Sequence, residues 1–291
     1  MVTKGLLSRY IGYLNSGCNL SSKLRLAIVL TFTNHIVLHR VPQTVRKILI
    51  KGANRLSRGV TTNIHGLKFR MRDYDSCYVC TPLFEDWSGD YLKVKEGDVF
   101  VDVGAHIGRY TLPVARTVGE KGLVIAVEAD AGNCNCLRNN IKLNNLHNII
   151  TINAAAWSNN ESLKFYPRES SEGGSIKKNM TDQGDNYVEV NGRTIDSILK
   201  EVKAEIQVDW IKIDVEGAEL EVLKGLNRTL LQNSPQLLVE VSEENRNAFE
   251  HSMNILNYRY YAIPESARKE LGSTIYYYCW TNKNSHDVNE K

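Results

Sequence analysis

The first 72 residues of this 291-residue chain contain no aspartate and no glutamate. They hold thirteen lysines and arginines, which leaves 23 of the 36 cations and all 33 acidic residues for the remainder. The formal net charge of +3 therefore combines a basic N-terminal region with a body of net charge −10. An acid-free basic region attached to an acidic body indicates a negatively charged partner.

Long apolar runs are also absent. The longest, residues 24–38, is interrupted by Arg25, Asn34 and His35, and it is shorter than the roughly 20 residues that a membrane-spanning helix needs. Arg9 interrupts the first apolar run, so a secretory signal peptide is not expected, while a transit peptide stays open. We expect a cytoplasmic protein, with peripheral association at a membrane as the alternative.

The chain has six cysteines, and their spacing does not define a metal site. The two short pairs are Cys77-x-x-Cys80 and Cys134-x-Cys136. A structural zinc site needs well-spaced pairs with matching ligands, so we predict no metal. No disulfide framework is indicated either, which favours a reducing compartment.

Residues 1–63 are predicted to form a basic helical extension. Residues 44–51, Thr-Val-Arg-Lys-Ile-Leu-Ile-Lys, place apolar side chains and cations on different faces of a helix. Such a helix can lie on an anionic membrane surface, or it can pack on the catalytic body with its cations in water. Nucleic acid is the weaker expectation, because aromatic residues are not interleaved with the cations.

Residues 98–283 alternate strands and helices, which is typical of an α/β fold. Because only residues 264–273 separate the last two strands, these should pair antiparallel. The result is a mainly parallel seven-stranded sheet with one reversed strand. The expected strands are 99–103, 123–128, 149–154, 210–214, 237–241, 258–263 and 274–280, and the expected helices are 109–118, 132–144, 217–231 and 244–257.

A glycine turn follows the first of these strands. It reads Asp102-x-Gly104-x-x-x-Gly108, which lacks the central glycine that a dinucleotide-binding turn uses to approach a pyrophosphate. Glu128 ends the next strand, where a carboxylate can accept hydrogen bonds from both ribose hydroxyls. A nucleoside without a diphosphate points to S-adenosylmethionine. The alternative is a plain turn in which the glycines only relieve backbone strain.

Further carboxylates lie at the ends of two later strands. Asp214 ends the expected strand 210–214 and Glu216 follows it, and Glu240 lies at the end of 237–241. Acids at the end of buried strands usually have a partner or a function. Structural alternatives are a helix cap for Glu216 and a solvated helix face for Glu219.

These residues carry a resemblance to the FkbM family of methyltransferases. It rests on Asp102-x-Gly-Ala-x-x-Gly, Glu128, Asn153-Ala154-Ala155 and above all on residues 211–219, Ile-Lys-Ile-Asp-Val-Glu-Gly-Ala-Glu. The resemblance covers residues 98–262, more loosely 64–97, and leaves a polar tail at 284–291. It implies the Rossmann-like fold of class I methyltransferases over residues 64–283, and S-adenosylmethionine-dependent O-methylation of a sugar or similar acceptor.

We assign provisional roles on this basis. Cofactor binding is expected from Asp102, Gly104, Ala105, Gly108, Glu128 and Ala155. Gly104 and Gly108 would surround the methionine, and Asp102 would orient their loop. Asp214 is the leading candidate for the base, followed by Glu216, Glu240 and His106, which stands where many family members have Asn. The acceptor is expected to be a small-molecule, glycan or lipid-linked hydroxyl. A nucleic-acid methyltransferase and a non-catalytic nucleoside-binding module are the alternatives, and the oligomeric state is not indicated.

Overall fold

The computed structural model describes residues 12, 14–33, 41–81, 84–167, 174–176, 186–203, 205–268 and 274–283. The predicted tail, residues 284–291, lies outside the described residues.

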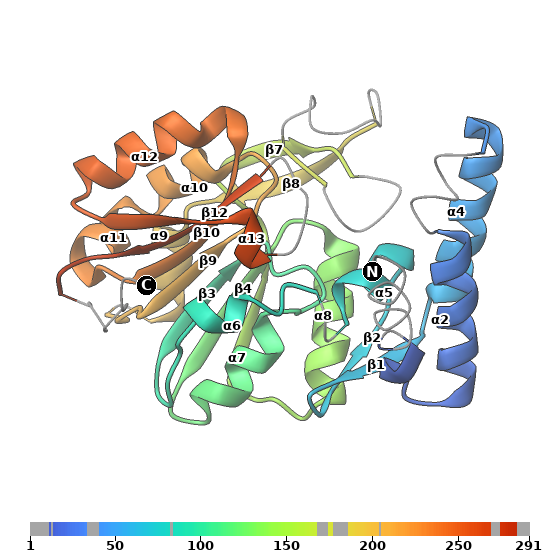
Figure 1. Cartoon of the computed structure of the whole chain (residues 1–291). Helices are drawn as coiled ribbons and strands as arrows, with labels where there is room; N and C mark the ends of the chain where they lie inside the picture. The colour runs from blue at the N-terminus through green and yellow to red at the C-terminus, as the bar shows by residue number, and fades with distance from the viewer. Residues whose placement is uncertain are drawn as a thin grey trace.

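A seven-stranded sheet occupies the centre of the molecule (Figure 1). Its strand order is β11-β12-β10-β9-β3-β4-β5, and β12 runs antiparallel to both of its neighbours while the remaining pairs are parallel. The predicted sheet with one reversed strand is therefore confirmed. The strands are β3 (Val99–Val103), β4 (Leu123–Glu128), β5 (Ile149–Asn153), β9 (Trp210–Ile213), β10 (Gln236–Ser242), β11 (Arg259–Ile263) and β12 (Thr274–Trp280).

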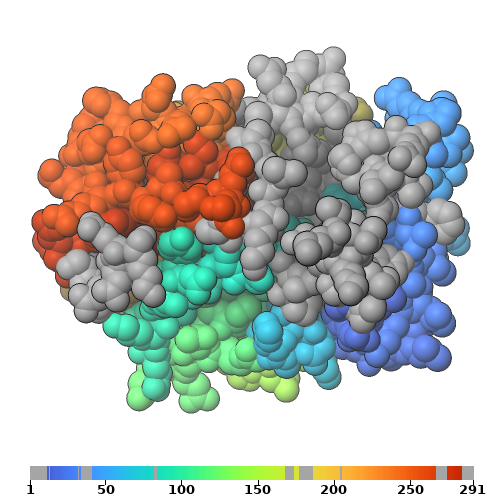
Figure 2. Space-filling model, in the orientation of Figure 1, coloured from blue at the N-terminus to red at the C-terminus, as the bar shows by residue number. Residues whose placement is uncertain are grey.

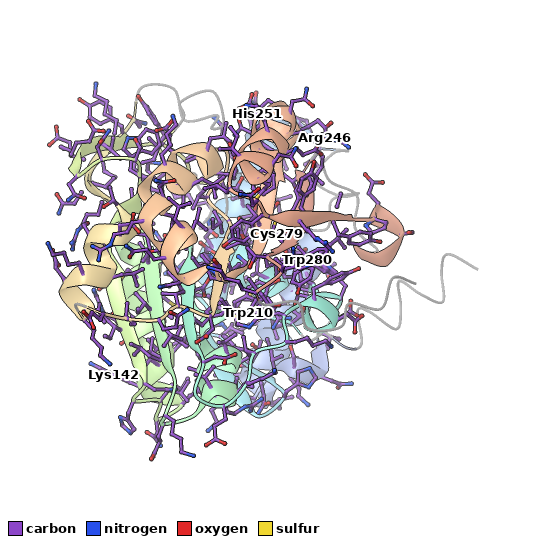
Figure 3. The ribbon with its side chains drawn as sticks, turned by 90° about the vertical axis from the view of Figure 1, so that its left-hand side faces the viewer. Lys142, Trp210, Arg246, His251, Cys279 and Trp280 are labelled. Atoms are coloured by element: carbon purple, nitrogen blue, oxygen red, sulfur yellow. The ribbon has the colours of Figure 1, made fainter. Side chains whose placement is uncertain are left out.

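Helices cover both faces of this sheet, because successive strand residues point to opposite faces. Val101 and Val103 pack towards one helical layer, while Phe100 packs towards the other. Figure 3 shows Trp210 and Cys279 inside this sandwich and Arg246 on α12 outside it. The first layer is formed by α9 (Ile195–Val202), α10 (Glu219–Gly225), α11 (Asn227–Asn233) and α12 (Arg246–Ile255), and the second by α7 (Thr111–Val118) and α8 (Ala131–Leu143).

The helix expected at 217–231 is two helices. The first, α10, ends at Gly225, and α11 begins at Asn227. A Cβ atom at Gly225 would lie 2.1 Å from the carbonyl oxygen of Trp157, so the chain after β6 (Ala155–Ala156) passes directly against this helix end. The continuous helical pattern in the sequence could not show this crossing.

The N-terminal region packs on the body as an outer layer. It contains α2 (Leu20–Phe32), α4 (Gln43–Ser57) and the antiparallel hairpin of β1 (Thr61–Ile64) and β2 (Leu67–Arg70), followed by α5 (Tyr74–Val79) and α6 (Ser88–Tyr91). Leu26, Val29 and Ala53 share one apolar cluster with Leu112 and Leu137 of the body. The inner faces of both helices are therefore buried, and the boundary expected after residue 63 falls inside β1.

A small three-stranded sheet stands beside the main one. Its order is β6-β8-β7, with β7 at Glu161–Phe165 and β8 at Val188–Arg193. Along the chain this small sheet lies between β5 and β9 of the main sheet. A short helix, α13 (Glu265–Arg268), follows β11.

Candidate functional site

A cavity of about 280 Å³ opens where β3, β4, β9 and β10 reach their carboxyl ends. In parallel α/β sheets this edge is the usual place for a ligand. The cavity brings together nine of the ten residues singled out in the sequence. They are Asp102, Gly104, Ala105, His106, Glu128, Ala155, Asp214, Glu216 and Glu240.

Gly104 joins the two main loops of this cavity. Its φ of +84° is one that L side chains rarely adopt, and a Cβ atom there would lie 1.8 Å from the carbonyl oxygen of Asp214. Its amide and that of Ala105 both donate to the carbonyl of Val127. The glycine turn is thus pressed between the ends of β4 and β9, and only glycine fits at this point.

Gly108 has a different position from the one expected. A Cβ atom there would lie 2.3 Å from Leu112 Cδ1 and 2.7 Å from Leu137 Cδ1. These leucines belong to α7 and α8, and Gly108 is not among the described residues that line the cavity. The second glycine of the turn therefore permits helix packing rather than contributing to the cavity wall.

Glu128 is buried at the end of β4 but keeps room for a ligand. One carboxylate oxygen accepts from the His106 amide at 2.7 Å and the other from the Asp130 amide at 2.9 Å. The Asn133 side chain is a third hydrogen-bond partner, and a carboxylate has about four acceptor sites, so acceptor capacity remains for a hydroxyl donor. Burial raises the pKa of Glu128 to about 7, although the two amide hydrogen bonds oppose this shift.

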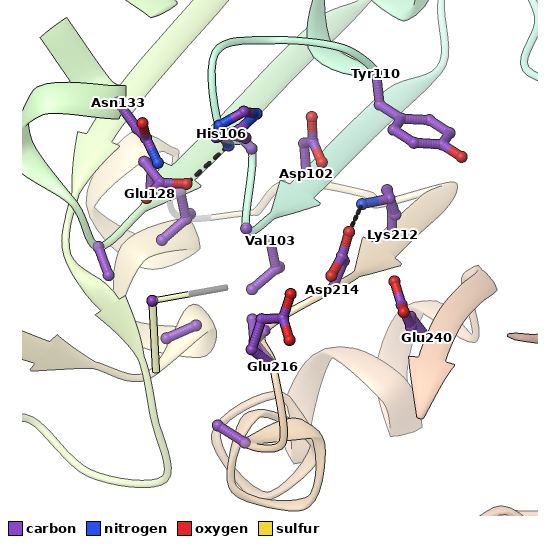
Figure 4. A pocket seen from close by; sticks show the side chains of 18 of the residues that line it. Asp102, Val103, His106, Tyr110, Glu128, Asn133, Lys212, Asp214, Glu216 and Glu240 are labelled. Atoms are coloured by element: carbon purple, nitrogen blue, oxygen red, sulfur yellow. Dashed lines mark hydrogen bonds and ion pairs between the residues drawn. The ribbon is translucent and has the colours of Figure 1, made fainter. Parts of the chain in front are cut away.

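His106 lies at the same end of the cavity as Glu128 (Figure 4). Burial lowers the pKa of His106 to about 4, the Asp73 charge opposes this shift and Arg72 adds to it, so the imidazole is neutral at pH 7. Its φ is +51°, a left-handed conformation in which asparagine is among the better tolerated residues. This backbone conformation explains why asparagine, which the family resemblance suggests at this position, fits there as well.

Asp102 carries an unsatisfied buried oxygen. Thr111 donates to Oδ2 at 2.5 Å, while Oδ1 has no hydrogen-bond partner among the described residues. Burial raises the pKa of this carboxyl, although Lys212 opposes the change. A buried acceptor without a donor is costly. An ammonium group or a water bound in the cavity would satisfy it.

Lys212 provides the positive charge at the end of the cavity opposite Glu128 and His106. It is buried within β9, and its Nζ lies 2.8 Å from Asp214 Oδ2 and 4.5 Å from the centre of the Tyr110 ring. Burial favours the neutral amine, but the carboxylates of Asp214, Asp102 and Glu85 outweigh it and raise the pKa of Lys212. The ammonium is therefore retained, and it orients one oxygen of Asp214.

Glu240 lies in a chain of short hydrogen bonds at this end. The Tyr276 hydroxyl is 2.6 Å from Glu85 Oε1 and 2.6 Å from Glu240 Oε2. A hydroxyl has one proton and can donate to only one of them, so one carboxyl must itself be protonated. Burial and the Asp214 charge raise the pKa of Glu240 well above its ordinary value. This shift favours Glu240 as the member of the pair that holds the proton.

Glu216 and Glu219 differ in location. Glu216 lines the cavity with φ of +52°, and its carbonyl accepts from Ser175 Oγ at 2.8 Å. Glu219 is buried rather than solvated, because its carboxylate accepts from the Gly217 amide at 2.6 Å and from Asn245 Nδ2 at 2.7 Å. The prediction that Glu219 lies on a solvated helix face is wrong, because its side chain is buried. Its partner Asn245 lies 26 residues further along the chain, so the local sequence did not indicate this contact.

Several cavity residues escape prediction from the sequence. Lys212 carried a usable signal, because a cation between isoleucines of a buried strand needs a partner. No local pattern marks the others, which come from separate elements: Glu85, Tyr110, Asn133 and Tyr276.

The cysteine pairs do not line this cavity among the described residues. Cys77 and Cys80 are buried, and burial raises the pKa of the Cys77 thiol to about 12. Within the described ranges no group of three or more His, Cys, Asp or Glu side chains is arranged to hold a metal ion.

Comparison with known proteins gives the class and then the family. Residues 102–263 match the model of the methyltransferase FkbM domain, which is more than half of the chain. The chain is a methyltransferase with a Rossmann-like class I fold, and it belongs to the FkbM family. S-adenosylmethionine is its cofactor.

Individual relatives are distant. A protein named methyltransferase 1 from Beauveria bassiana (strain ARSEF 2860) is 25% identical over 167 residues, which cover 52% of this chain and 67% of that protein. A 23S rRNA (uracil(1939)-C(5))-methyltransferase from Acinetobacter baumannii (strain SDF) is 29% identical over 109 residues, or 36% of this chain and 23% of that protein.

Among solved structures, methyltransferase FkbM from Methylobacillus flagellatus KT is 17% identical, with a TM-score of 0.49. The match covers 94% of this chain and 58% of that one, so this chain spans little more than half the length of that protein.

Proposed function

We propose that this chain transfers the methyl group of S-adenosylmethionine to a hydroxyl of a sugar, glycan or other small-molecule or lipid-linked acceptor. The observation that carries the proposal is the two-ended cavity in Figure 4. Glu128 and His106 form one end, Lys212, Asp214 and Glu240 form the other, and Gly104 holds the two together.

The donor end fits the nucleoside and the amino acid portion of the cofactor. The remaining acceptor capacity of the Glu128 carboxylate, beyond its bonds to two amides and Asn133, suits a ribose hydroxyl. The unpartnered Oδ1 of Asp102 suits the ammonium group of the methionine portion. Gly104 and Ala105 present backbone beside it, and Ala155 contributes a small apolar wall. We retain these residues as the cofactor site and withdraw Gly108 from direct contact.

Asp214 is the proposed base. S-adenosylmethionine supplies an electrophilic methyl group on a positively charged sulfur, so the protein has mainly to align the acceptor oxygen with it. Asp214 would accept the hydroxyl proton as the new oxygen–carbon bond forms, while Lys212 fixes the orientation of its carboxylate. Glu216 is the second candidate. The raised pKa of Glu240 favours its protonated form, which cannot accept the hydroxyl proton, and His106 lies at the donor end, so both rank lower.

A nucleic-acid acceptor is the alternative. The basic N-terminal region and the rRNA methyltransferase relative favour it. The cavity opposes it, because carboxylates of Glu85, Asp214 and Glu216 surround the acceptor end and would repel backbone phosphates. Salt-dependent association with RNA, together with methylation of RNA rather than of glycans, would favour the alternative. Cofactor binding without any turnover would favour a non-catalytic module.

The donor end is tested by calorimetry of S-adenosylmethionine binding to the Glu128→Ala variant. Loss of charged hydrogen bonds to the ribose should weaken binding by about 1.5–3 kcal/mol, or roughly 10- to 100-fold. An unchanged affinity would remove Glu128 from the ribose site. Glu161→Ala, an exposed carboxylate on β7, is the control and should bind normally.

The acceptor end is tested with labelled S-adenosylmethionine and a cell-derived glycan and lipid extract. The Asp214→Asn variant should bind the cofactor as the wild type does, while turnover falls about 10²- to 10⁴-fold. Full turnover in this variant would exclude Asp214 from proton transfer. Loss of cofactor binding would instead place Asp214 in the donor site.

A further inference from the structure

We infer that the outer faces of α2 and α4 form a docking surface for an anionic lipid membrane. The surface is defined by Leu20, Lys23, Leu24 and Ile28 of α2 and by Val45, Lys47, Ile48, Lys51, Arg55 and Leu56 of α4. It is separate from the cavity and independent of the proposed reaction.

An apolar stripe runs along the outside of α2. Leu20, Leu24 and Ile28 are four residues apart, which places them on one side of the helix. They are 72%, 57% and 42% exposed, whereas Leu26 and Val29 on the opposite side are fully buried. The helix therefore presents two apolar faces, and its packing on the body accounts for only one of them.

The outside of α4 has a similar stripe flanked by cations. Val45, Ile48 and Leu56 are 40%, 70% and 37% exposed, and Ile50 and Ala53 are buried on the inner side. Lys47, Lys51 and Arg55 are exposed beside this stripe. A helix with aliphatic side chains bordered by Lys and Arg is typical of segments that lie at a membrane interface.

The two helices lie side by side at the edge of the molecule, on the right-hand side of Figures 1 and 2. Arg25 fastens them together, since its guanidinium donates to the carbonyls of Leu56 and Arg58 at 2.7 and 2.6 Å. Six of the twelve large apolar side chains that are exposed among the described residues lie on this pair of helices. Exposed apolar side chains that had no common role would be distributed over the whole surface rather than gathered on two helices.

The positive charge of this surface favours an anionic lipid membrane over a second copy of the chain. No acidic residue occurs in the first 72 positions, so a second copy of this surface would repel it. An anionic lipid surface attracts clustered Lys and Arg and receives aliphatic side chains at the same time. Single-stranded RNA would instead require aromatic side chains for base stacking. The exposed apolar side chains of this surface are aliphatic throughout the described parts of both helices.

No described helix is both long and apolar enough to cross a bilayer. Attachment would therefore be peripheral and reversible, with electrostatic attraction screened by salt within about 10 Å at 0.1 M ionic strength. It would hold the enzyme near acceptors that are attached to lipids.

The test is co-sedimentation of the full chain with phosphatidylcholine vesicles that contain about 30% phosphatidylserine. Sedimentation is expected at low salt, with little on vesicles of phosphatidylcholine alone. Each cation near an anionic surface strengthens binding about fivefold, so Lys47→Glu/Lys51→Glu/Arg55→Glu should weaken it at least 100-fold. Leu24→Ser/Ile48→Ser should weaken it about tenfold without any change in net charge.

Matched control variants lie elsewhere on the surface. Lys93→Glu/Lys142→Glu/Lys200→Glu makes the same change in net charge at exposed cations of the body, and Leu231→Ser/Ile255→Ser removes exposed aliphatic side chains from α11 and α12. Both should sediment nearly as the wild type does. Because all of these side chains are exposed, thermal unfolding should stay close to that of the wild type.

Three results would overturn the inference. The first is a wild-type chain that stays in the supernatant with anionic vesicles at low salt. The second is equal loss of binding in the control variants, which would mean attraction by net charge alone. The third is vesicle binding that survives Leu24→Ser/Ile48→Ser while an oligouridine probe binds tightly and is released by the charge reversals, which would identify an RNA surface.

Discussion

The two ends of the cavity are built in different ways. At the donor end, backbone groups set the geometry: amides of His106 and Asp130 position Glu128, and Gly104 allows two loops to touch. At the acceptor end, charged side chains from distant segments stabilise one another, because Asp214 pairs with Lys212 and the Glu85 carboxylate also favours its ammonium form. A cofactor can thus be held by a local motif, whereas the groups around an acceptor depend on the whole fold.

The largest expected effect comes from removing the cation of the acceptor end. Lys212→Met leaves several buried carboxylates without their counter-charge, so it should lower the free energy of unfolding by about 3–5 kcal/mol. Urea denaturation measures this loss. Lys224→Met, which breaks an exposed pair with Glu221, should cost less than about 1 kcal/mol. Equal losses in both variants would mean that charge balance does not organise the acceptor end.

The contact between the two ends is tested next. Gly104→Ala introduces a Cβ atom against the Asp214 carbonyl at a positive φ, so it should destabilise the fold by about 3 kcal/mol. Gly52 of α4 has no atom near its Cβ position, and Gly52→Ala should stabilise the protein by about 0.5–1 kcal/mol. Denaturation curves of the two variants should therefore shift in opposite directions. A neutral Gly104→Ala would mean that the loops are free to separate.

A smaller effect is expected from the hydroxyl of Tyr276, which lies between the carboxyls of Glu85 and Glu240. Tyr276→Phe removes the hydroxyl between Glu85 and Glu240 and should cost about 1–3 kcal/mol, because two buried carboxyls lose a partner. Tyr261→Phe, at an exposed position on β11, should change stability by less than about 0.5 kcal/mol. If Tyr276→Phe behaves like this control, the hydrogen-bonded chain contributes nothing to stability.

The mildest effect concerns pH at the donor end. Burial raises the pKa of Glu128 from 4.5 to about 7. The contribution of its protonated form to the free energy of unfolding is therefore complete below pH 4.5 and is lost as the pH rises through about 7. Ribose hydroxyls prefer the ionised carboxylate, so cofactor affinity should increase between pH 6 and 8, by at most about tenfold per unit.

Calorimetry across this range should show the increase in the wild type and a flat profile in Glu128→Gln. His106→Asn should keep the wild-type profile, because the pKa of His106 lies near 4. A flat wild-type profile, or one abolished by His106→Asn, would assign the titration to another group.

The sheet and most of its strands could be predicted because apolar periodicity is a local property. The seven strands have bounds within about one residue of those expected, and the short segment between β11 and β12 correctly indicated an antiparallel pair. The prediction was less accurate for the helices, because α10 ends where Trp157 crosses it. It also misplaced Glu219, whose partner Asn245 is 26 residues away.

The sequence by itself determined the class of this protein. The glycine turn, Glu128 and the motif around Asp214 lie at strand ends, and the ends of parallel strands meet at one edge whatever the details of packing. Only the tertiary structure decided that Gly108 packs against helices, that burial raises the pKa of Glu240, and that α2 and α4 each keep one apolar face in solvent. These properties depend on neighbours that are remote along the chain, so no local pattern encodes them.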